Sequence, residues 1–465
     1  MADYPGIARL QPYLSKAVEL FRDLKDFYIF THIDADGISS GSIIAKTAIR
    51  LSRKFTLRTL LQLDPLSLSQ IPSDINAIFV DFGSSFVGDI AEKVNSAIIL
   101  DHHVIVETKN YSNVVHVNPH LVGIDGGFNI SASGLAFLFS INVNDSNIDL
   151  IHMALAGATG DIQDVGKNHS FIGINEEIAS MGIRYGYVNK ILDFRIPGYD
   201  TKPASHAFAH SFPELPFYGN IKGAREFITM QCKVDIGPEN NEKRLSELTH
   251  DEKNRILDGL GTLIAQGISK NMLYDLYGYI YTFPRQQSPF LRNSIDLANL
   301  LNACGKSNHP GIGVAILLGR EELIPEAHIL ASQFRYKLSS LMDQLKKGGK
   351  LSRRENFFYF HLGEEGNEGM LSSLASLLIR NLDRPLIGMI HSANDMTKVS
   401  ARAPMDYKGN MGIIMRKAAE KVGGTGGGHA LAAGALVPSD KENEFIEIVD
   451  SLIKEEIERE ESEKS

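Results

Sequence analysis

The chain has 465 residues, of which 43% are hydrophobic and 22% charged, and its formal net charge is −9. This length predicts more than one domain, and this composition is typical of a soluble globular protein. The sequence contains no run of 18 apolar residues, and its first residues show no basic region followed by an apolar core, so we expect no membrane span, no secretion and a cytoplasmic location. The two cysteines, Cys232 and Cys304, form no CxxC pair, which argues against a disulfide framework or a cysteine-bound metal.

The first 160 residues alternate between helical and strand-like patterns. Apolar residues at helical spacing predict a helix over residues 6–26. Apolar runs predict strands at 27–30, 55–63, 77–80, 97–100 and 114–117, with helices at 38–52 and 87–95 and, further on, at about 131–139 and 148–159. Nearly continuous apolar strands separated by helices predict an α/β fold whose parallel sheet is covered on both faces.

The pattern changes after about residue 190, where prolines interrupt the chain. A helix is expected from Thr249, which has Glu252 three residues on as in a capping box. A long helix over 323–345 is expected to end in a hinge at Lys346-Lys347-Gly348-Gly349. We therefore predict an N-terminal α/β domain over 1–190, a mixed connecting region over 191–345, and a smaller α/β domain over 346–465.

Acidic and histidine side chains stand at the ends of four apolar segments. They are His32, Asp34 and Asp36; Asp81; Asp101, His102 and His103; and Asp161. An aspartate after a strand is often only a helix cap, and Asp81 alone would be read that way. The carboxyl ends of parallel strands meet at one edge, however, so these carboxylates would lie together and repel one another. The recurrence therefore predicts a metal centre.

The residue types at this edge indicate which metal they would hold. Carboxylates and imidazoles without thiolates suit Mn²⁺, or Mg²⁺ where oxygen ligands dominate. Two such ions bridged by one carboxylate form a clamp that is typical of enzymes that hydrolyse phosphate esters. We therefore predict two divalent cations, Mn²⁺ or Mg²⁺, as cofactors.

At these residues the chain resembles the DHH phosphoesterase superfamily, and within it the RecJ-like single-strand exonucleases of the archaeal type, which carry a C-terminal DHHA1 domain. The resemblance rests on six motifs: His32-Ile33-Asp34-Ala35-Asp36-Gly37, Asp81-Phe82-Gly83, Asp101-His102-His103, Gly160-Asp161, Ser400-Ala401-Arg402 and Gly426-Gly427-Gly428-His429. They lie at both ends of the chain, whereas the middle region carries no such motif.

The resemblance implies a role for each of these residues. His32, Asp34 and Asp81 would hold one ion, and Asp36, Asp81, His102 and Asp161 the other, with Asp81 as the bridge. His103, with Asp101, would be catalytic and contact the scissile phosphate. In the DHHA1 domain, across a groove, the substrate phosphates would be bound by Ser400, Arg402 and a glycine-rich loop made of Gly426, Gly427, Gly428 and His429.

The resemblance also implies a function: a two-metal exonuclease for single-stranded DNA or RNA, acting in replication or repair. Family relatives supply two alternatives, a phosphodiesterase for short oligonucleotides or cyclic dinucleotides and a subunit of a replication complex associated with GINS. A basic run lies at Arg335, Lys337, Lys346, Lys347, Lys350, Arg353 and Arg354. It is read equally well as a nucleic-acid contact or as a solvated helix face.

Overall fold

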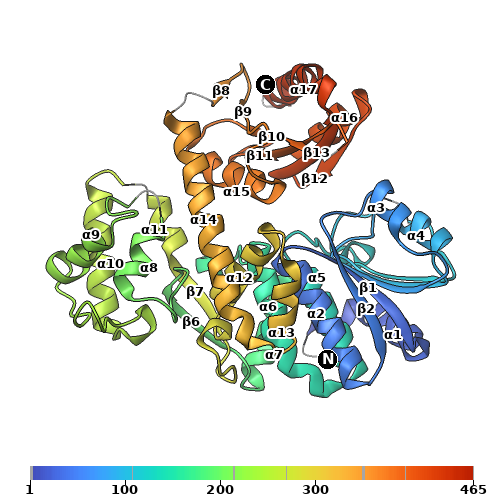
Figure 1. Ribbon diagram of the computed structural model, residues 1–465, viewed down its shortest axis with the longest axis horizontal. Helices are drawn as coiled ribbons and strands as arrows, with labels where there is room; N and C mark the ends of the chain where they lie inside the picture. Colours follow the sequence, from blue (N-terminus) through green and yellow to red (C-terminus); the bar gives the residue numbers. More distant parts are fainter. Residues whose placement is uncertain are drawn as a thin grey trace. The chain divides into compact units, whose positions relative to one another are not determined.

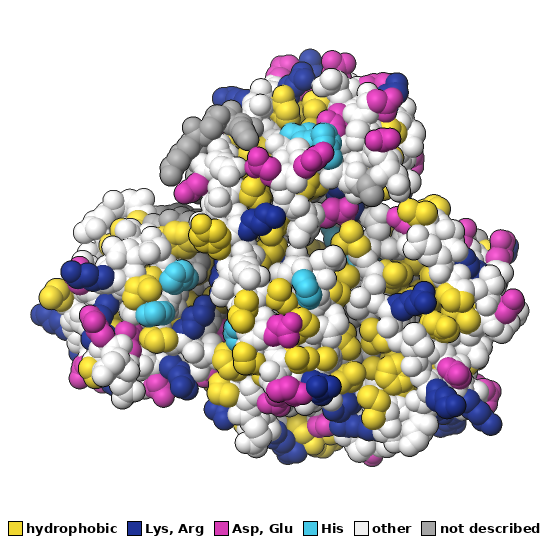
Figure 2. Space-filling model, viewed as in Figure 1, with side chains coloured by type: hydrophobic (Ala, Val, Ile, Leu, Met, Phe, Trp, Pro, Cys, Tyr) yellow, Lys and Arg dark blue, Asp and Glu magenta, His cyan; other side chains and the backbone are white. Residues whose placement is uncertain are grey.

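The computed structural model describes residues 4–106, 108–212, 215–268, 270–347, 351–392 and 394–463. It divides into two compact units, Met1–Ala327 and His328–Ser465 (Figure 1). Within the described residues, no helix is long and apolar enough to cross a membrane. Figure 2 shows basic and acidic side chains interspersed over the face in view, on a chain whose net charge is −9.

The first unit is built around a five-stranded sheet. Its strands are β1 (Asp26–His32), β2 (Lys54–Leu60), β3 (Asn76–Val80), β4 (Ser96–Leu100) and β5 (Val114–Val117). They are all parallel, in the order β2-β1-β3-β4-β5, which confirms the predicted sheet. The chain leaves β1 for β2 on one side and then crosses to β3 on the other. Open α/β sheets form their ligand crevice at such a switch point, at the carboxyl ends of the strands.

Helices cover both faces of this sheet, as Figure 1 shows. Helices α1 (Pro5–Asp23), α2 (Ala35–Arg50) and α5 (Ala132–Val143) share one core with Ile29, Ile78 and Ile98 of the strands. The neighbouring strand residues Phe30, Phe79 and Ile99 point to the opposite face, where they pack with α3 (Pro65–Gln70) and α4 (Val87–Lys93). Because both of their faces are buried, the inner strands β1, β3 and β4 read in the sequence as nearly continuous apolar runs, whereas the edge strand β2 alternates polar and apolar residues.

A second core occupies the middle of the chain. Strand β6 (Asn189–Phe194) pairs antiparallel with β7 (Tyr277–Thr282), after α6 (Ile151–Gly160) and α7 (Gly173–Arg184). Helices α8 (Ala204–Ala209), α9 (Ile221–Glu226), α10 (His250–Ala265) and α11 (Lys270–Leu276) lie between these two strands in sequence. The predicted capping box of Thr249 and Glu252 is present at the start of α10.

The next two helices return to the parallel sheet. Helices α12 (Ser294–Lys306) and α13 (Pro310–Leu317) pack on α2, and α12 also packs on α6. Their Leu297, Leu301 and Ile316 belong to the first core. Part of the region 191–345 therefore completes the N-terminal core. The boundaries at 190 and 345 stay a prediction.

The second unit has a six-stranded mixed sheet. Helix α14 (Ile324–Lys347) leads into it, and Gly348 and Gly349 of the expected hinge lie outside the described residues. The strand order is β12-β13-β11-β10-β9-β8, with β10 parallel to β9 and the other pairs antiparallel. Its elements are β8 (Ser352–Arg353), β9 (Phe358–His361), α15 (Glu368–Leu378), β10 (Leu386–Ser392), β11 (Met396–Arg402), α16 (Met411–Lys421), β12 (Thr425–Gly428), β13 (Ala432–Pro438) and α17 (Glu442–Glu463).

The glycine-rich stretch of this unit forms strand β12 and not the expected loop. A Cβ on Gly426 would lie 2.6 Å from the carbonyl oxygen of Met415 in α16, and Gly428 has a φ of 133°. Gly426 is therefore needed because α16 packs directly against this strand, and Gly428 because its backbone has a positive φ, whereas a Cβ on Gly427 would meet nothing within 4 Å. That steric requirement leaves no signal in the local sequence that would distinguish it from a phosphate-binding loop.

Candidate metal centre

The polar cluster lies at the carboxyl edge of the parallel sheet, around the switch point between β1 and β3. His32 ends β1, and Asp34 caps helix α2 by accepting a hydrogen bond from the Gly37 N–H at 2.9 Å. Asp81 directly follows β3, and His102 follows β4. Three segments that are distant in sequence thus bring their polar side chains to one place, as the sequence predicted for the strand ends.

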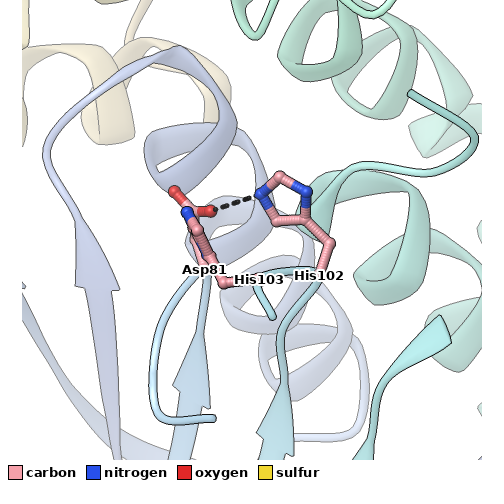
Figure 3. Close-up of side chains that lie close together, drawn as sticks. All are labelled: Asp81, His102 and His103. Atoms are coloured by element: carbon pink, nitrogen blue, oxygen red, sulfur yellow. Dashed lines mark ion pairs between the residues drawn. The ribbon is translucent and has the colours of Figure 1, made fainter. Parts of the chain in front are cut away.

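The two oxygens of Asp81 face two different histidines. Oδ2 lies 3.4 Å from His32 Nδ1, which is also 2.9 Å from Asp34 Oδ2. Oδ1 lies 3.3 Å from His102 Nε2. Figure 3 shows this contact between Asp81, which follows β3, and His102, which follows β4. The cluster therefore has two halves joined by one buried carboxylate, which is the arrangement that a bridging ligand between two cations requires.

The second half of the cluster is completed from the helices and not from the sheet. Asp161 follows the last residue of α6, and its Oδ2 lies 3.4 Å from His102 Nε2. Asp36 Oδ2 lies 4.0 Å from the same nitrogen. The expectation that converging strand ends assemble the site therefore needs a correction for Asp161, because it is a helix C-terminus that carries this residue.

Asp36 is fully buried and held by the first turn of α5. Its Oδ2 accepts the N–H of Ala132 at 2.7 Å, and its Oδ1 accepts the N–H of Ser133 at 3.0 Å. Burial, together with the charge of Asp81, raises the pKa of Asp36 to about 6. Burial and the charge of Asp36 raise the pKa of Asp161 as well. In the protein chain by itself, this concentration of buried negative charge is thus costly, and a cation would relieve it.

His102 provides the test of whether a metal fits. Its Nδ1 lies 2.8 Å from the carbonyl oxygen of Gly126, and because a carbonyl only accepts, Nδ1 carries the proton. This tautomer turns the lone pair of Nε2 toward the cluster, where that buried nitrogen has no hydrogen-bond partner. A ring nitrogen fixed by a backbone carbonyl on its far side is the arrangement that metal-binding histidines adopt. The residues present therefore fit a divalent cation.

His103 and Asp101 form a pair beside this cluster. The Nδ1 of His103 lies 2.8 Å from Asp101 Oδ1, which also accepts the His103 N–H at 3.1 Å. The other oxygen of Asp101 accepts the N–H of Ser84 at 2.9 Å. Burial would raise the pKa of Asp101, but His103 and Ser84 hold it well below its usual range. Asp101 therefore orients the ring, so that His103 would contact a substrate through Nε2.

Three polar residues that the sequence did not single out, of which Gln163 and Asn118 are buried, support the site. Gln163 donates to the same Gly126 oxygen as His102, at 2.9 Å. Asn118 donates to the backbone oxygen of His103 at 2.9 Å, and Asn302 of α12 accepts the N–H of Ala35 at 3.0 Å. Each acts on the backbone of a neighbouring segment, and no residue pattern in a single sequence marks such a contact.

A cavity opens on the cluster and has walls of two kinds. One wall is formed by the charged and imidazole side chains of His32, Asp34, Asp81, Asp101, His103 and Asp161. The other contains the apolar side chains of Leu61, Leu63, Phe82 and Phe86. Such a cavity can take a ligand that has both an anionic and an apolar part.

Most of the residues predicted to bind substrate in the second unit lie on two strands of its sheet that are separated by a third. Ser400 and Arg402 are on β11, Gly426 to Gly428 on β12, and β13 runs between them. The Arg402 guanidinium donates to Ser376 Oγ at 3.0 Å and to the Ala401 oxygen at 2.8 Å. Within the described chain its hydrogen bonds go to neutral oxygens, and burial lowers its pKa. A partly buried cation held by neutral oxygens suits an anionic ligand.

The end of the glycine-rich stretch is occupied by backbone contacts. The carbonyl oxygens of His429 and Ala430 accept the N–H groups of Gly412 and Met411, at the start of α16. These N–H groups are therefore already used within the unit. The assignment of Gly426, Gly427, Gly428 and His429 to substrate binding stays a prediction.

A further cluster in the second unit is suited to internal hydrogen bonding. His361 Nε2 and His391 Nε2 lie 3.2 and 3.5 Å from Glu442 Oε1. The Nδ1 of His361 accepts the N–H of Gly363 at 2.8 Å, so in the neutral ring the proton is on Nε2, facing Glu442. His361 thus donates to the carboxylate at the start of α17 and has no lone pair there for a metal.

Comparisons with known proteins agree with this architecture. Two family models match: "DHH family, N-terminal domain" over residues 26–159 and "DHHA1 domain" over residues 354–455. An uncharacterized protein of Methanocaldococcus jannaschii is 31% identical over 441 residues, which are 93% of this chain and 94% of that protein.

Among solved structures, RecJ of Thermus thermophilus in complex with Mn²⁺ has a TM-score of 0.58 at 15% identity. The match covers 97% of this chain and 55% of that one, so the chain spans about half the length of this RecJ. CDC45 of Entamoeba histolytica has a TM-score of 0.64 at 12% identity, with 96% and 99% of the two chains covered. At these identities the likeness shows a shared fold.

Proposed function

Because the chain belongs to the DHH/DHHA1 family, as a RecJ-like metal-dependent phosphoesterase, we propose that it is an exonuclease that hydrolyses the phosphodiester bonds of single-stranded DNA or RNA. The observation that carries this proposal is the placement of Asp81, whose two oxygens lie 3.3 and 3.4 Å from histidines of two separate halves of the cluster. This arrangement supports one carboxylate shared by the ligand sets of two cations, which is what two-metal hydrolysis of phosphodiesters would use.

The two halves of the cluster define the proposed ligand sets. One cation, Mn²⁺ or Mg²⁺, would be held by His32, Asp34 and Asp81, whose ligand atoms lie within 4.8 Å of one another. The other would be held by Asp36, His102 and Asp161 together with Asp81. When bound, the cations would supply Lewis acidity and a water that is deprotonated near neutral pH.

The other polar residues of the chain would bind and orient the substrate. With Nδ1 of His103 donating to Asp101, the ring in its imidazolium form would donate its Nε2–H to a non-bridging oxygen of the scissile phosphate, where negative charge increases during the reaction. In the second unit, Ser400 and Arg402 would bind phosphates further along the strand, with Gly426 to Gly428 and His429 beside them. The apolar cavity wall formed by Leu61, Leu63 and Phe86 supports a nucleotide over a purely inorganic phosphate substrate.

The test is digestion of single-stranded DNA and RNA oligonucleotides of about 30 nucleotides in the presence of Mn²⁺. Each oligonucleotide is labelled first at one end and then at the other. We expect stepwise shortening of at least one of them, and a lower rate on a dinucleotide. Asp81→Ala removes the bridge and should lower the rate by about 10³-fold or more. The control is Asp149→Ala, because Asp149 pairs with Arg50 on the surface, and this variant should digest normally. Undiminished activity of Asp81→Ala would refute the mechanism.

The fold similarity to CDC45 supports a second candidate, a subunit of a replication complex that binds GINS. The two candidates differ in their use of the metal centre. Co-purification with GINS and no detectable hydrolysis by the wild-type protein would favour the subunit. Hydrolysis that is lost in Asp81→Ala would favour the exonuclease, whether or not GINS is bound.

A further inference from the structure

Ile162, the residue directly after the predicted metal ligand Asp161, combines backbone strain with exposure of its side chain. Its φ is 58°, in the left-handed region that β-branched residues rarely adopt. Its side chain is 73% exposed. Both the exposure of this apolar side chain to solvent and the left-handed backbone cost free energy, so the presence of isoleucine at this position needs an explanation.

The strain arises at the end of helix α6. The Ile162 N–H donates to the Thr159 oxygen at 3.1 Å, and the Gln163 N–H to the Ala158 oxygen at 3.0 Å. This pair of bonds defines a Schellman motif, in which the left-handed residue is usually glycine. The same pair of bonds ends six other α-helices of the described chain, where the residue is Gly186, Gly267, Gly319, Gly423, Ser52 or Asn308. Among these described helix ends, Ile162 is the only β-branched residue.

The neighbouring residues fix the loop in this conformation. Gln163 is fully buried, donates to the Gly126 oxygen at 2.9 Å and accepts from Asn175 Nδ2 at 2.7 Å. Asp164 is buried and forms an ion pair with Arg195. Val165, like Ile162, is exposed. The loop therefore buries its polar side chains and exposes its apolar ones, the reverse of the usual arrangement.

A glycine at position 162 would remove both the strain and the exposed apolar surface without disturbing these anchors. Strained residues that persist in this way cluster at functional sites, where the strain is part of the function. The position of Ile162 next to Asp161 limits what it could contact, because neighbouring Cα atoms are only about 3.8 Å apart. A ligand whose phosphate lies at the cluster would place its next group within reach of this side chain.

We propose that Ile162, with Val165 in the same loop, is a specificity-determining contact for the nucleobase of the nucleotide whose phosphate reaches the metal centre. This inference rests on the proposed exonuclease function and specifies its substrate class. The phosphate and sugar of a nucleotide are polar, whereas the base offers an apolar face that packs on a side chain without sequence readout. The enzyme therefore prefers a single-stranded nucleic acid that has a base at this position over one that has an abasic residue there.

The test is a cycle of two enzymes and two substrates. Wild type and Ile162→Gly are each assayed on a single-stranded oligonucleotide with ordinary terminal nucleotides and on one with an abasic residue at the digested end. We expect Ile162→Gly to lower kcat/KM about tenfold on the ordinary strand and to leave the abasic strand unchanged. Ile162→Val, which keeps a β-branched apolar side chain, should retain most of the activity.

The matched control is Ser52→Gly, at the same position of the Schellman motif that ends α2. Both glycine variants should have a higher Tm, because both relieve a left-handed residue, but only Ile162→Gly should change the kinetics. An equal loss on both substrates, or no loss, would overturn the inference while leaving the exonuclease intact. If the wild type hydrolyses neither substrate, the proposed function fails and this inference fails with it.

Discussion

Asp81 shows how one residue can serve the site through both its backbone and its side chain. Its φ is 67°, and its N–H donates to the Leu100 oxygen at 3.0 Å, so the turn after β3 is held against β4. Aspartate tolerates this left-handed conformation better than most residues because its short side chain can bond locally. The turn directs the two carboxylate oxygens into the two halves of the cluster.

At the residue scale, we predict that metal binding releases protons. The pKa of Asp36 is raised to about 6. Burial would lower the pKa of His102, but Asp81 and Asp161 raise it well above its usual value. A cation must displace these protons, so metal affinity should rise with pH as Asp36 ionises around its pKa of about 6, and again at higher pH as His102 loses its proton. Calorimetric titration with Mn²⁺ in two buffers of different ionisation enthalpy measures this release.

The control for this prediction is Asp81→Ala, which should bind Mn²⁺ weakly and show no such release. A binding enthalpy of the wild type that is the same in both buffers would contradict the prediction, because no protons would then reach the buffer.

At the scale of elements, helix α12 is part of the metal centre although it is far from β1 in sequence. Asn302 accepts the N–H of Ala35, and Gly305 lies against the loop between His32 and Asp34. A Cβ on Gly305 would lie 1.7 Å from the Ile33 carbonyl oxygen, which is backbone and cannot turn aside. The helix therefore sets the position of the loop that carries two predicted ligands.

We predict that Gly305→Ala shifts this loop and weakens the cation site of His32 and Asp34. The loss in Mn²⁺ affinity should be about 10- to 100-fold, as for other residues that orient metal ligands. The control is Gly311→Ala in α13, where a Cβ meets nothing within 4 Å and should be tolerated. Counting bound Mn²⁺ by electron paramagnetic resonance checks this, and full occupancy in Gly305→Ala would disprove the positioning role.

At the scale of the whole molecule, the two units have separate cores. Phe357, Val399 and Val449 belong to a core of the second unit, whereas Ile29, Ile78 and Leu297 belong to the first. All the predicted metal ligands lie in the unit Met1–Ala327. A cation should therefore stabilise the first unit and leave the second one unchanged.

We predict two unfolding transitions in scanning calorimetry, of which Mn²⁺ raises only one. At about 100 times the Kd of one site, the gain in the free energy of unfolding is about 2.7 kcal/mol. The raised transition should be the one that also shifts in Gly305→Ala, and the Mn²⁺ effect should disappear in Asp81→Ala. An equal shift of both transitions would mean that the cation also acts on the second unit.

Much of the first unit could be predicted from the sequence because its signals are local. Each buried strand is a continuous apolar run, and Asp34, Asp81 and His102 follow closely where these runs end. The parallel order of the strands then follows from their alternation with helices. The glycine-rich stretch forms a strand where a loop was expected, because a glycine needed for close packing on α16 looks the same in sequence as one in a phosphate-binding loop; its assignment to substrate binding stays a prediction.

The sequence by itself determined the sheet, the polar residues at its carboxyl edge and the kind of metal that they suit, because these depend on residue type and short spacing. Only the tertiary structure decided how the residues are grouped. Four features depend on contacts between distant segments. They are the two carboxylate oxygens of Asp81 that face different histidines, the Gly126 carbonyl behind His102, the close approach of Gly305 to Ile33, and the exposed Ile162. Such contacts arise from the packing of whole helices against the sheet, and the residues that make them carry no local mark.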